Sequence, residues 1–265
     1  MAQTQSKTNK TTRNTLKKTP KAEPKIPLLT VTNLTSGYGT LKILRDVTFT
    51  VPQRTAMLLM GPNGCGKSTL LKTIIGENKP WTATSVIQFK DHKWSRKNNA
   101  SIDTRINAGI GYLRQVQNVF TNLTVQENLE TSLLPLPELN KSQAIDAILQ
   151  DFPMLKGKLD KRAGLLSGGQ RQALAIAMVL IKPCSLYLLD EPSAGLSPAA
   201  AMEIMDCLKN FKNSHKDISI LMVEHRLELL KWMDAACVMQ QGTIVQQYDD
   251  IKKALAESSL TEHYF

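Results

Sequence analysis

From residue 28 onward, short apolar segments alternate along the chain with longer amphipathic ones. Short apolar runs are typical of buried strands, and apolar residues recurring at helical spacing predict helices that pack on them. The alternation therefore predicts an α/β protein. The expected strands are 28–34, 44–51, 55–60, 110–115, 186–192, 218–225, 236–240 and 243–247, with edge strands within 81–103 and a turn at 36–40; the expected helices are 69–75, 124–133, 142–152, 171–181, 199–211, 226–233 and 250–258.

Residues from about 116 to 182 are predicted to be mostly helical and to form an insertion between strands. Thr124 and Glu127 have the spacing of a capping box, which starts a helix. Ser167 is a natural N-cap for the next apolar helix, and the glycines that follow it allow close backbone approach. A helix N-terminus of this kind is open to an anion, although the alternative is an ordinary capped helix.

The chain has 265 residues and a formal net charge of +10, and most of the excess lies at the N-terminus. Residues 1–26 contain seven Lys and Arg against one Glu and almost no apolar residues. This composition predicts a disordered basic tail that precedes a folded domain over 27–265. The tail could touch anionic lipid or RNA, but a solvated extension is favoured, and no specific nucleic-acid partner is expected.

The longest apolar run, 173–181, is too short to cross a bilayer, and the N-terminus lacks the apolar centre of a secretory signal. Four cysteines are scattered without paired spacing, which favours reduced thiols over a disulfide framework or a zinc site. These features predict a cytoplasmic protein that would associate with a membrane only through a partner.

A glycine-rich loop between a predicted strand and a predicted helix carries the chemistry. It matches the phosphate-binding pattern G-x-x-x-x-G-K-[ST], whose glycines turn backbone N–H groups toward one point at a helix N-terminus. We expect Lys67 to reach the β- and γ-phosphates and the Ser68 hydroxyl to hold Mg²⁺. The expected nucleotide-binding residues of this loop are Gly61, Pro62, Asn63, Gly64, Cys65, Gly66, Lys67, Ser68 and Thr69.

Two predicted strands end in polar residues that suit phosphoryl chemistry. Asp190 ends an apolar strand as a Mg²⁺ ligand would, and Glu191 follows as a candidate base on water. His225 ends the next apolar strand and is a candidate contact for a γ-phosphate. Taken alone, each has a plain structural alternative, namely a strand-ending turn or a structural histidine. Tyr38, on a glycine-flanked turn, is either an adenine-stacking residue or an ordinary packing residue.

Together these motifs resemble the ATPase subunits of ABC transporters. The resemblance covers about residues 28–247, and Leu-Ser-Gly-Gly-Gln some way before Asp-Glu-Pro makes it specific. It rests on Tyr38, residues 61–68, Gln115, residues 166–170, Asp190, Glu191 and His225.

The family resemblance implies a P-loop NTPase with a mixed sheet core, an antiparallel β subdomain and an inserted helical subdomain. It also implies a head-to-tail dimer with two ATP molecules at the interface, formed by two copies or by a paralogue pair. Each ATP would lie between one subunit's phosphate loop and the other subunit's residues 167–170. The implied roles are adenine stacking by Tyr38, Mg²⁺ contact by Ser68, Gln115 and Asp190, polarisation of water by Glu191, γ-phosphate support by His225, and ATP contact across the interface by Ser167, Gly168, Gly169 and Gln170.

Within the family, segments 118–129, 152–155, 162–164 and 192–198 look like the ATPases of branched-chain amino-acid and urea importers, with the lipopolysaccharide-export ATPase as the nearest alternative. A further alternative is an ABC ATPase that acts on nucleic acid. The resemblance implies that this subunit lies on the cytoplasmic face of the inner (plasma) membrane, bound to separate transmembrane permease subunits and, indirectly, to a solute-binding protein. Val116, Val119, Phe120 and Leu123 are expected to form the permease groove, although Arg114 stands where the family usually has proline.

Overall fold

The computed structural model describes residues 26–115, 118–136, 138–226 and 230–256. At its centre is a six-stranded sheet in the order β10-β9-β3-β8-β7-β6. The five strands from β9 to β6 run parallel, and β10 is antiparallel to β9, so the sheet is mixed as expected. The strands are β3 (Ala56–Met60), β6 (Ile110–Leu113), β7 (Leu186–Asp190), β8 (Ser219–Val223), β9 (Ala235–Gln240) and β10 (Thr243–Tyr248).

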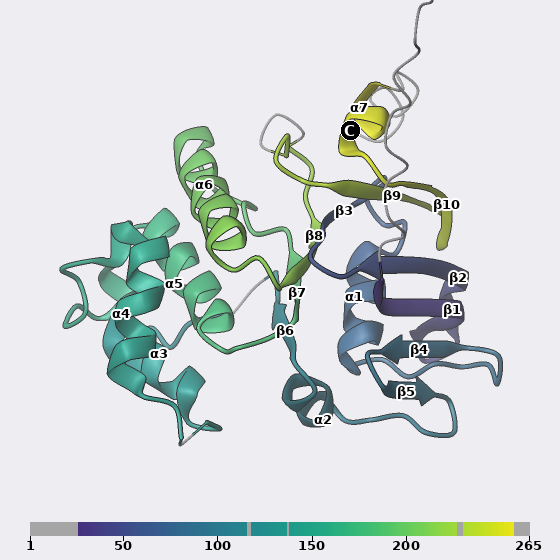
Figure 1. Cartoon of the computed structure of the whole chain (residues 1–265), viewed down its shortest axis with the longest axis horizontal. Coiled ribbons are helices and arrows are strands. Elements are labelled where there is room, and N and C mark those ends of the chain that lie inside the picture. Colours follow the sequence, from purple (N-terminus) through teal and green to yellow (C-terminus); the bar gives the residue numbers. More distant parts are fainter. Residues whose placement is uncertain (1–25, 116–117, 137, 227–229, 257–265) are drawn as a thin grey trace, which may run out of the picture.

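A second, antiparallel sheet has the order β2-β1-β4-β5. Its strands are β1 (Pro27–Tyr38), β2 (Leu41–Pro52), β4 (Val86–Phe89) and β5 (His92–Ser95). Helix α1 (Lys67–Ile75) packs between the two sheets, where Leu70 and Ile74 are fully buried (Figure 1). This sheet confirms the expected antiparallel β subdomain.

The helices α3 (Val125–Leu133), α4 (Lys141–Asp151) and α5 (Gly168–Leu180) gather beside the parallel end of the central sheet (Figure 1). The long helix α6 (Pro198–Ser214) packs against α4 and α5. Shorter elements are α2 (Ile102–Asn107), α7 (Ile251–Ala256) and the 3₁₀ turns Pro153–Leu155 and Ala163–Leu165. Among the residues that the structure describes, no helix is both long enough and apolar enough to cross a membrane.

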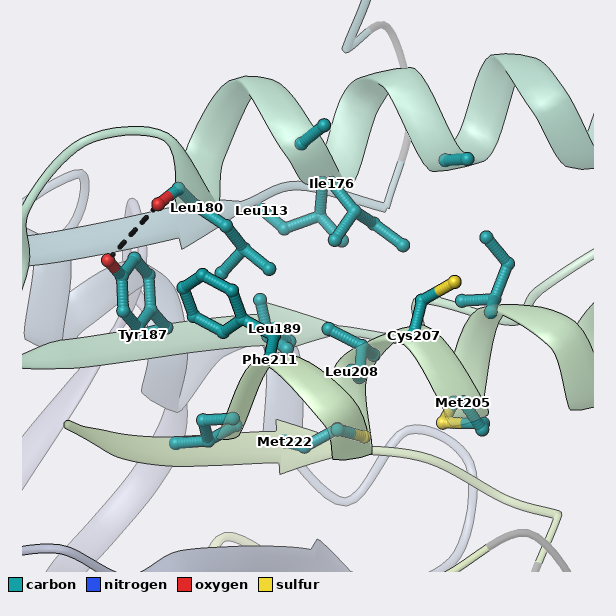
Figure 2. Close-up of a cluster of buried hydrophobic side chains, with 14 of the residues drawn as sticks. Leu113, Ile176, Leu180, Tyr187, Leu189, Met205, Cys207, Leu208, Phe211 and Met222 are labelled. Atoms are coloured by element: carbon teal, nitrogen blue, oxygen red, sulfur yellow. Dashed lines mark hydrogen bonds between the residues drawn. The ribbon is translucent and has the colours of Figure 1, made fainter. Parts of the chain in front are cut away.

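One hydrophobic core joins the central sheet to α5 and α6. Figure 2 shows Ile176 of α5 and Leu208 of α6 packed with strand residues such as Leu189, all of them fully buried. The hydroxyl of Tyr187 donates to the carbonyl oxygen of Leu180, 3.3 Å away, and so ties β7 to the end of α5 (Figure 2). The sheet and these helices thereby form one packed unit.

The local helix signals are confirmed. Thr124 and Glu127 form the predicted capping box at the start of α3, and Ser167 forms another with Gln170 at the start of α5. Because Ser167 is the N-cap, α5 begins at Gly168, three residues earlier than its apolar pattern indicated. Strand β1 runs through Tyr38, so the expected turn shortens to Gly39 and Thr40.

One predicted helix is wrong where the structure describes it, and one observed helix was not predicted. Arg226 and residues 230–233 are not helical, and residues 227–229 lie outside the described part of the chain. Tertiary bonds hold both ends of this short segment, since the Arg226 guanidinium donates to Leu196 and the Asp234 carboxylate accepts the N–H of Ala56. Helix α2, capped by Ser101, was not predicted; the polar segment expected to hold edge strands, 81–103, overlaps only its first two residues. The basic tail, up to residue 25, also lies outside the described residues.

Candidate functional site

The phosphate loop connects β3 to α1 at the carboxyl edge of the central sheet. Gly61, Gly64 and Gly66 have φ values of 146°, 76° and 112°, which side chains other than hydrogen rarely permit. A Cβ on Gly61 would lie 2.1 Å from the carbonyl oxygen of Met239, so this position also requires glycine for space. The loop is therefore a tight backbone cradle that opens onto the N-terminus of α1.

The Lys67 amine turns back onto its own loop. Its Nζ donates to the carbonyl oxygens of Gly61, at 2.7 Å, and Pro62, at 3.0 Å. The side chain is 6% exposed, and burial lowers the pKa of the amine. Because these bonds are to neutral carbonyls, an incoming phosphate group offers the ammonium a stronger, charged acceptor.

Asp190 ends β7 beside the phosphate loop. The Ser68 hydroxyl donates to Asp190 Oδ1 at 3.0 Å, and the aspartate is 1% exposed. Burial raises the pKa of Asp190 to about 6, although the Ser68 bond opposes that rise. A hydroxyl oxygen and a carboxylate oxygen at this spacing are the hard donors that Mg²⁺ takes when phosphates and water complete its shell. The residues present therefore fit the ion.

Glu191 is held between two polar side chains. Gln115 Nε2 donates to Glu191 Oε2 at 2.8 Å, and His225 Nε2 lies 3.2 Å from Glu191 Oε1. The φ of Glu191 is +50°, so the backbone takes the left-handed conformation directly after Asp190. The glutamate thereby points away from Asp190, and the structure brings together three residues that are far apart in the sequence.

Sequence reasoning passed over Glu224, although this acid ends an apolar strand directly before His225. It is 3% exposed, and its carboxylate accepts from Ser193 Oγ at 2.6 Å and from the backbone N–H of His225 at 2.8 Å. The sequence did offer a signal, because an acid directly after an apolar run and next to a candidate site residue is itself a candidate.

Tyr38 lies apart from these acids, at the end of β1. The residue is 44% exposed, and its hydroxyl lies 3.5 Å from Thr69 Oγ1, the donor at the start of α1. The ring is thus accessible next to the phosphate loop, where a base could stack on it. The stacking role stays a prediction.

Residues 167–170 form the N-terminus of α5, with Ser167 as its N-cap. Ser167 and Gly168 are exposed, and the Ser167 hydroxyl accepts the N–H of Gln170 at 3.3 Å. In the described part of the chain, no hydrogen bond or ion pair joins residues 167–170 to residues 61–69. Within one subunit, the N-terminus of α5 is therefore not bonded to the phosphate loop.

An open cavity of about 360 Å³ lies between the segment that follows β6 and helix α5. It is lined by Gln115, Asn118 and Val119 on one side and by Gly168 and Arg171 on the other. Of the other residues expected to form the permease groove, Phe120 is 57% exposed, and Val116 lies outside the described residues. Arg114, the unexpected residue before Gln115, pairs with Glu77 at 2.6 Å and also lines an adjoining cavity.

Comparison with known proteins decides the family. Residues 44–194 match the family model described as ABC transporter. The chain belongs to this family. It is an ATP-binding subunit of an ABC transporter and an ATPase, as its motifs predicted.

Several curated relatives cover the same part of the chain. A probable branched-chain amino acid transport ATP-binding protein, LivF of Archaeoglobus fulgidus, is 36% identical over 82% of this chain and 90% of its own length. The high-affinity branched-chain amino acid transport ATP-binding protein BraG of Pseudomonas aeruginosa is 32% identical over 82% and 91%. The lipopolysaccharide export ATP-binding protein LptB of Haemophilus influenzae is 31% identical over 82% and 89%.

Solved structures agree with the fold. A nucleotide-free ATP-binding cassette from an ABC transporter superposes with a TM-score of 0.75 at 27% identity, covering 89% of this chain and 98% of that one. The ADP conformation of an ATP-binding cassette of an ABC transporter gives the same TM-score, identity and coverage. The P-loop ATPase fold is thus confirmed, while the role of each site residue stays a prediction.

Proposed function

We propose that this ABC transporter subunit hydrolyses ATP in a head-to-tail dimer, in which each ATP is gripped by the phosphate loop of one subunit and by residues 167–170 of the other. One observation supports this most directly. The helix N-terminus at Ser167 is exposed and, among the residues that the structure describes, makes no bond to the phosphate loop of the same subunit. A partner subunit supplies the geometry that brings the two motifs to one nucleotide.

In this site, Lys67 and the N–H groups of residues 61–69 bind the phosphates. Ser68 and Asp190 hold Mg²⁺, which neutralises charge on the transferred phosphoryl group. Glu191 polarises the attacking water, and Gln115 and His225 orient its carboxylate from either side. His225 also supports the γ-phosphate, and Tyr38 stacks on the adenine. The two-subunit arrangement makes hydrolysis depend on dimer closure.

The cavity lined by Val119 and Arg171 is the proposed seat of a short helix from a separate permease. Gln115 lines this cavity and also bonds to Glu191. A movement of the permease helix in the cavity would therefore shift Gln115 and, through it, the carboxylate that activates water. Arg114 then adds a positive side chain to the adjoining surface.

The proposed cargo is a branched-chain amino acid or a related small polar solute, taken up with the help of a solute-binding protein. Support comes from LivF and BraG, whose names give that transport function. LptB, at 31% identity, supports the alternative of an export ATPase. The subunit would sit at the cytoplasmic face, where its four buried free cysteines stay reduced. Identifying the permease that co-purifies with this chain would distinguish between the two cargoes.

Dimer formation is tested with Glu191→Gln, which removes the carboxylate that polarises water but keeps a side chain of the same shape. We expect MgATP to convert this variant from monomer to dimer in size-exclusion chromatography, since bound ATP persists. Glu203→Gln, on the exposed face of α6, is the matched control and should hydrolyse ATP as the wild type does. A Glu191→Gln protein that binds MgATP but stays monomeric contradicts the proposal.

The contact across the interface is tested with Gly168→Trp. A Cβ at Gly168 meets no atom within 4 Å and the residue is exposed, so we expect the free subunit to fold with the larger side chain. We expect ATP binding to one subunit to persist while turnover is lost, because the ring occupies the space of the partner's phosphates. Lys141→Trp at the exposed start of α4 is the control. Undiminished turnover of Gly168→Trp contradicts the two-subunit site.

A further inference from the structure

The segments that follow β7 and β8 meet at one buried carboxylate, that of Glu224, which is 3% exposed. The two strands are parallel neighbours, and Asp190 pairs with Val223 at their carboxyl ends. The next residues, Glu191 and Glu224, therefore leave the sheet side by side. Glu191 reaches His225 and Gln115, whereas Glu224 is buried against the segment after β7.

Each oxygen of the Glu224 carboxylate serves one of the two segments. Oε2 accepts from Ser193 Oγ at 2.6 Å and from Ser193 N at 3.2 Å. Oε1 accepts from the backbone N–H groups of His225, at 2.8 Å, and Arg226, at 3.4 Å. An ionised carboxylate only accepts hydrogen bonds, and such charge-assisted bonds are stronger than neutral ones. The four donors thus hold Ser193 and His225 at a fixed separation.

A second connection joins the same two segments. The Arg226 guanidinium donates to the carbonyl oxygen of Leu196 at 2.8 Å. Residues 193–196 are therefore tied at both ends to residues 224–226. A displacement of one segment must move the other or break these bonds.

We propose that Glu224 is a positioning residue that couples residues 193–196 to His225. The proposal rests on the function above, in which His225 supports the γ-phosphate, and on the family resemblance, which implies that residues 193–196 form a loop that crosses to the partner subunit. When the partner subunit closes on residues 193–196, Glu224 transmits that placement to the backbone N–H of His225. The histidine then adopts its working position only in the closed dimer.

The test is Glu224→Gln, which keeps the size of the side chain but directs an NH₂ group at N–H or O–H donors. We expect kcat at saturating MgATP to fall about tenfold or more, with the KM for ATP and the Tm near those of the wild type, since the phosphate loop is untouched. A merely structural role would lower the Tm and weaken ATP binding together with kcat. Asp234→Asn is the matched control. Asp234 also accepts a backbone N–H, that of Ala56 at 2.8 Å, but it does so at the end of β3 that lies away from the phosphate loop.

Ser193→Ala tests the same bond from the other side and keeps the proposal open to refutation if Glu224→Gln fails to fold. This small truncation should lower kcat in the same direction, and the double variant should lose no more than Glu224→Gln alone. Wild-type kcat in a folded Ser193→Ala or Glu224→Gln protein overturns the coupling. That outcome is distinct from failure of the proposed function, in which Glu191→Gln would not dimerise with MgATP.

Discussion

Asp190 makes the subunit less stable at neutral pH than it would be with a neutral side chain at that position. The carboxylate is 1% exposed, and burial raises its pKa from the ordinary 3.8 to about 6. The unfolded chain therefore loses this proton at lower pH than the folded protein does. Between those two values, stability falls as the pH rises, because the folded state binds more protons than the unfolded state.

Replacing the acid with its neutral isostere, Asp190→Asn, removes that cost. The amide oxygen can still accept the Ser68 hydroxyl, so the packing and the hydrogen bond at 3.0 Å are kept. Since each tenfold change in proton affinity is worth about 1.4 kcal/mol, the variant should be more stable than the wild type by about 3 kcal/mol at pH 7.5. At pH 5 the gain should shrink to about half, because the folded wild type is then largely protonated.

The assay is urea unfolding at both pH values, without nucleotide and with a chelator to remove divalent cations. Asp217→Asn, at an exposed aspartate, is the control and should leave the free energy of unfolding nearly unchanged. ATP turnover by Asp190→Asn should be lost. An Asp190→Asn protein no more stable than the wild type at pH 7.5, or one whose gain grows toward pH 5, would refute the reasoning.

Three other variants test buried polar contacts by thermal unfolding. Arg105→Met should lower stability by about 2 kcal/mol, because the fully buried guanidinium caps the end of α1 by donating to the carbonyl oxygen of Ile74. Arg105→Lys should recover little of this stability, since an ammonium group lacks the planar fork of donors. Asn128→Leu should cost about 3 kcal/mol, because its amide bonds both the N–H and the carbonyl oxygen of Phe120; an unchanged Tm would contradict this. Tyr187→Phe should cost about 1 kcal/mol through loss of its bonds at the end of α5, and equal stability would show that water replaces them.

The sequence predicted those features that depend on neighbouring residues. The phosphate loop, the Thr124–Glu127 capping box, the Ser167 N-cap and the apolar strand that ends at Asp190 are local patterns, and each formed as expected. The strand predicted up to His225 formed too, but it ends at Val223. The order of the strands was not predictable from such patterns, because β3 pairs with β8 and β9, which lie far along the chain. Only the family resemblance indicated the mixed and antiparallel sheets.

The polar residues that sequence reasoning missed act over long sequence separations. Arg105 lies in a polar stretch, yet it is fully buried and stacks over Trp94 with its guanidinium carbon 4.4 Å from the ring centroid. No local pattern distinguishes such an arginine from a solvated one. Asn128 gave a weak signal, since it falls on the buried face of α3 beside Leu129. The helix predicted over 226–233 is absent at Arg226 and at residues 230–233, where tertiary bonds such as that from Arg226 to Leu196 hold the chain instead.

The place of β3 in the sheet has a consequence for where this chain can be cut. Residues 44–194 carry the family match, but β8 and β9, which flank β3 on either side, both follow residue 194. A fragment ending there would expose both edges of the strand that feeds the phosphate loop. The phosphate loop would also lose the backbone of Met239, which packs against Gly61, and the bond from the Gly242 N–H to the Cys65 carbonyl oxygen. Split-protein reporters and truncations should therefore be placed beyond Tyr248.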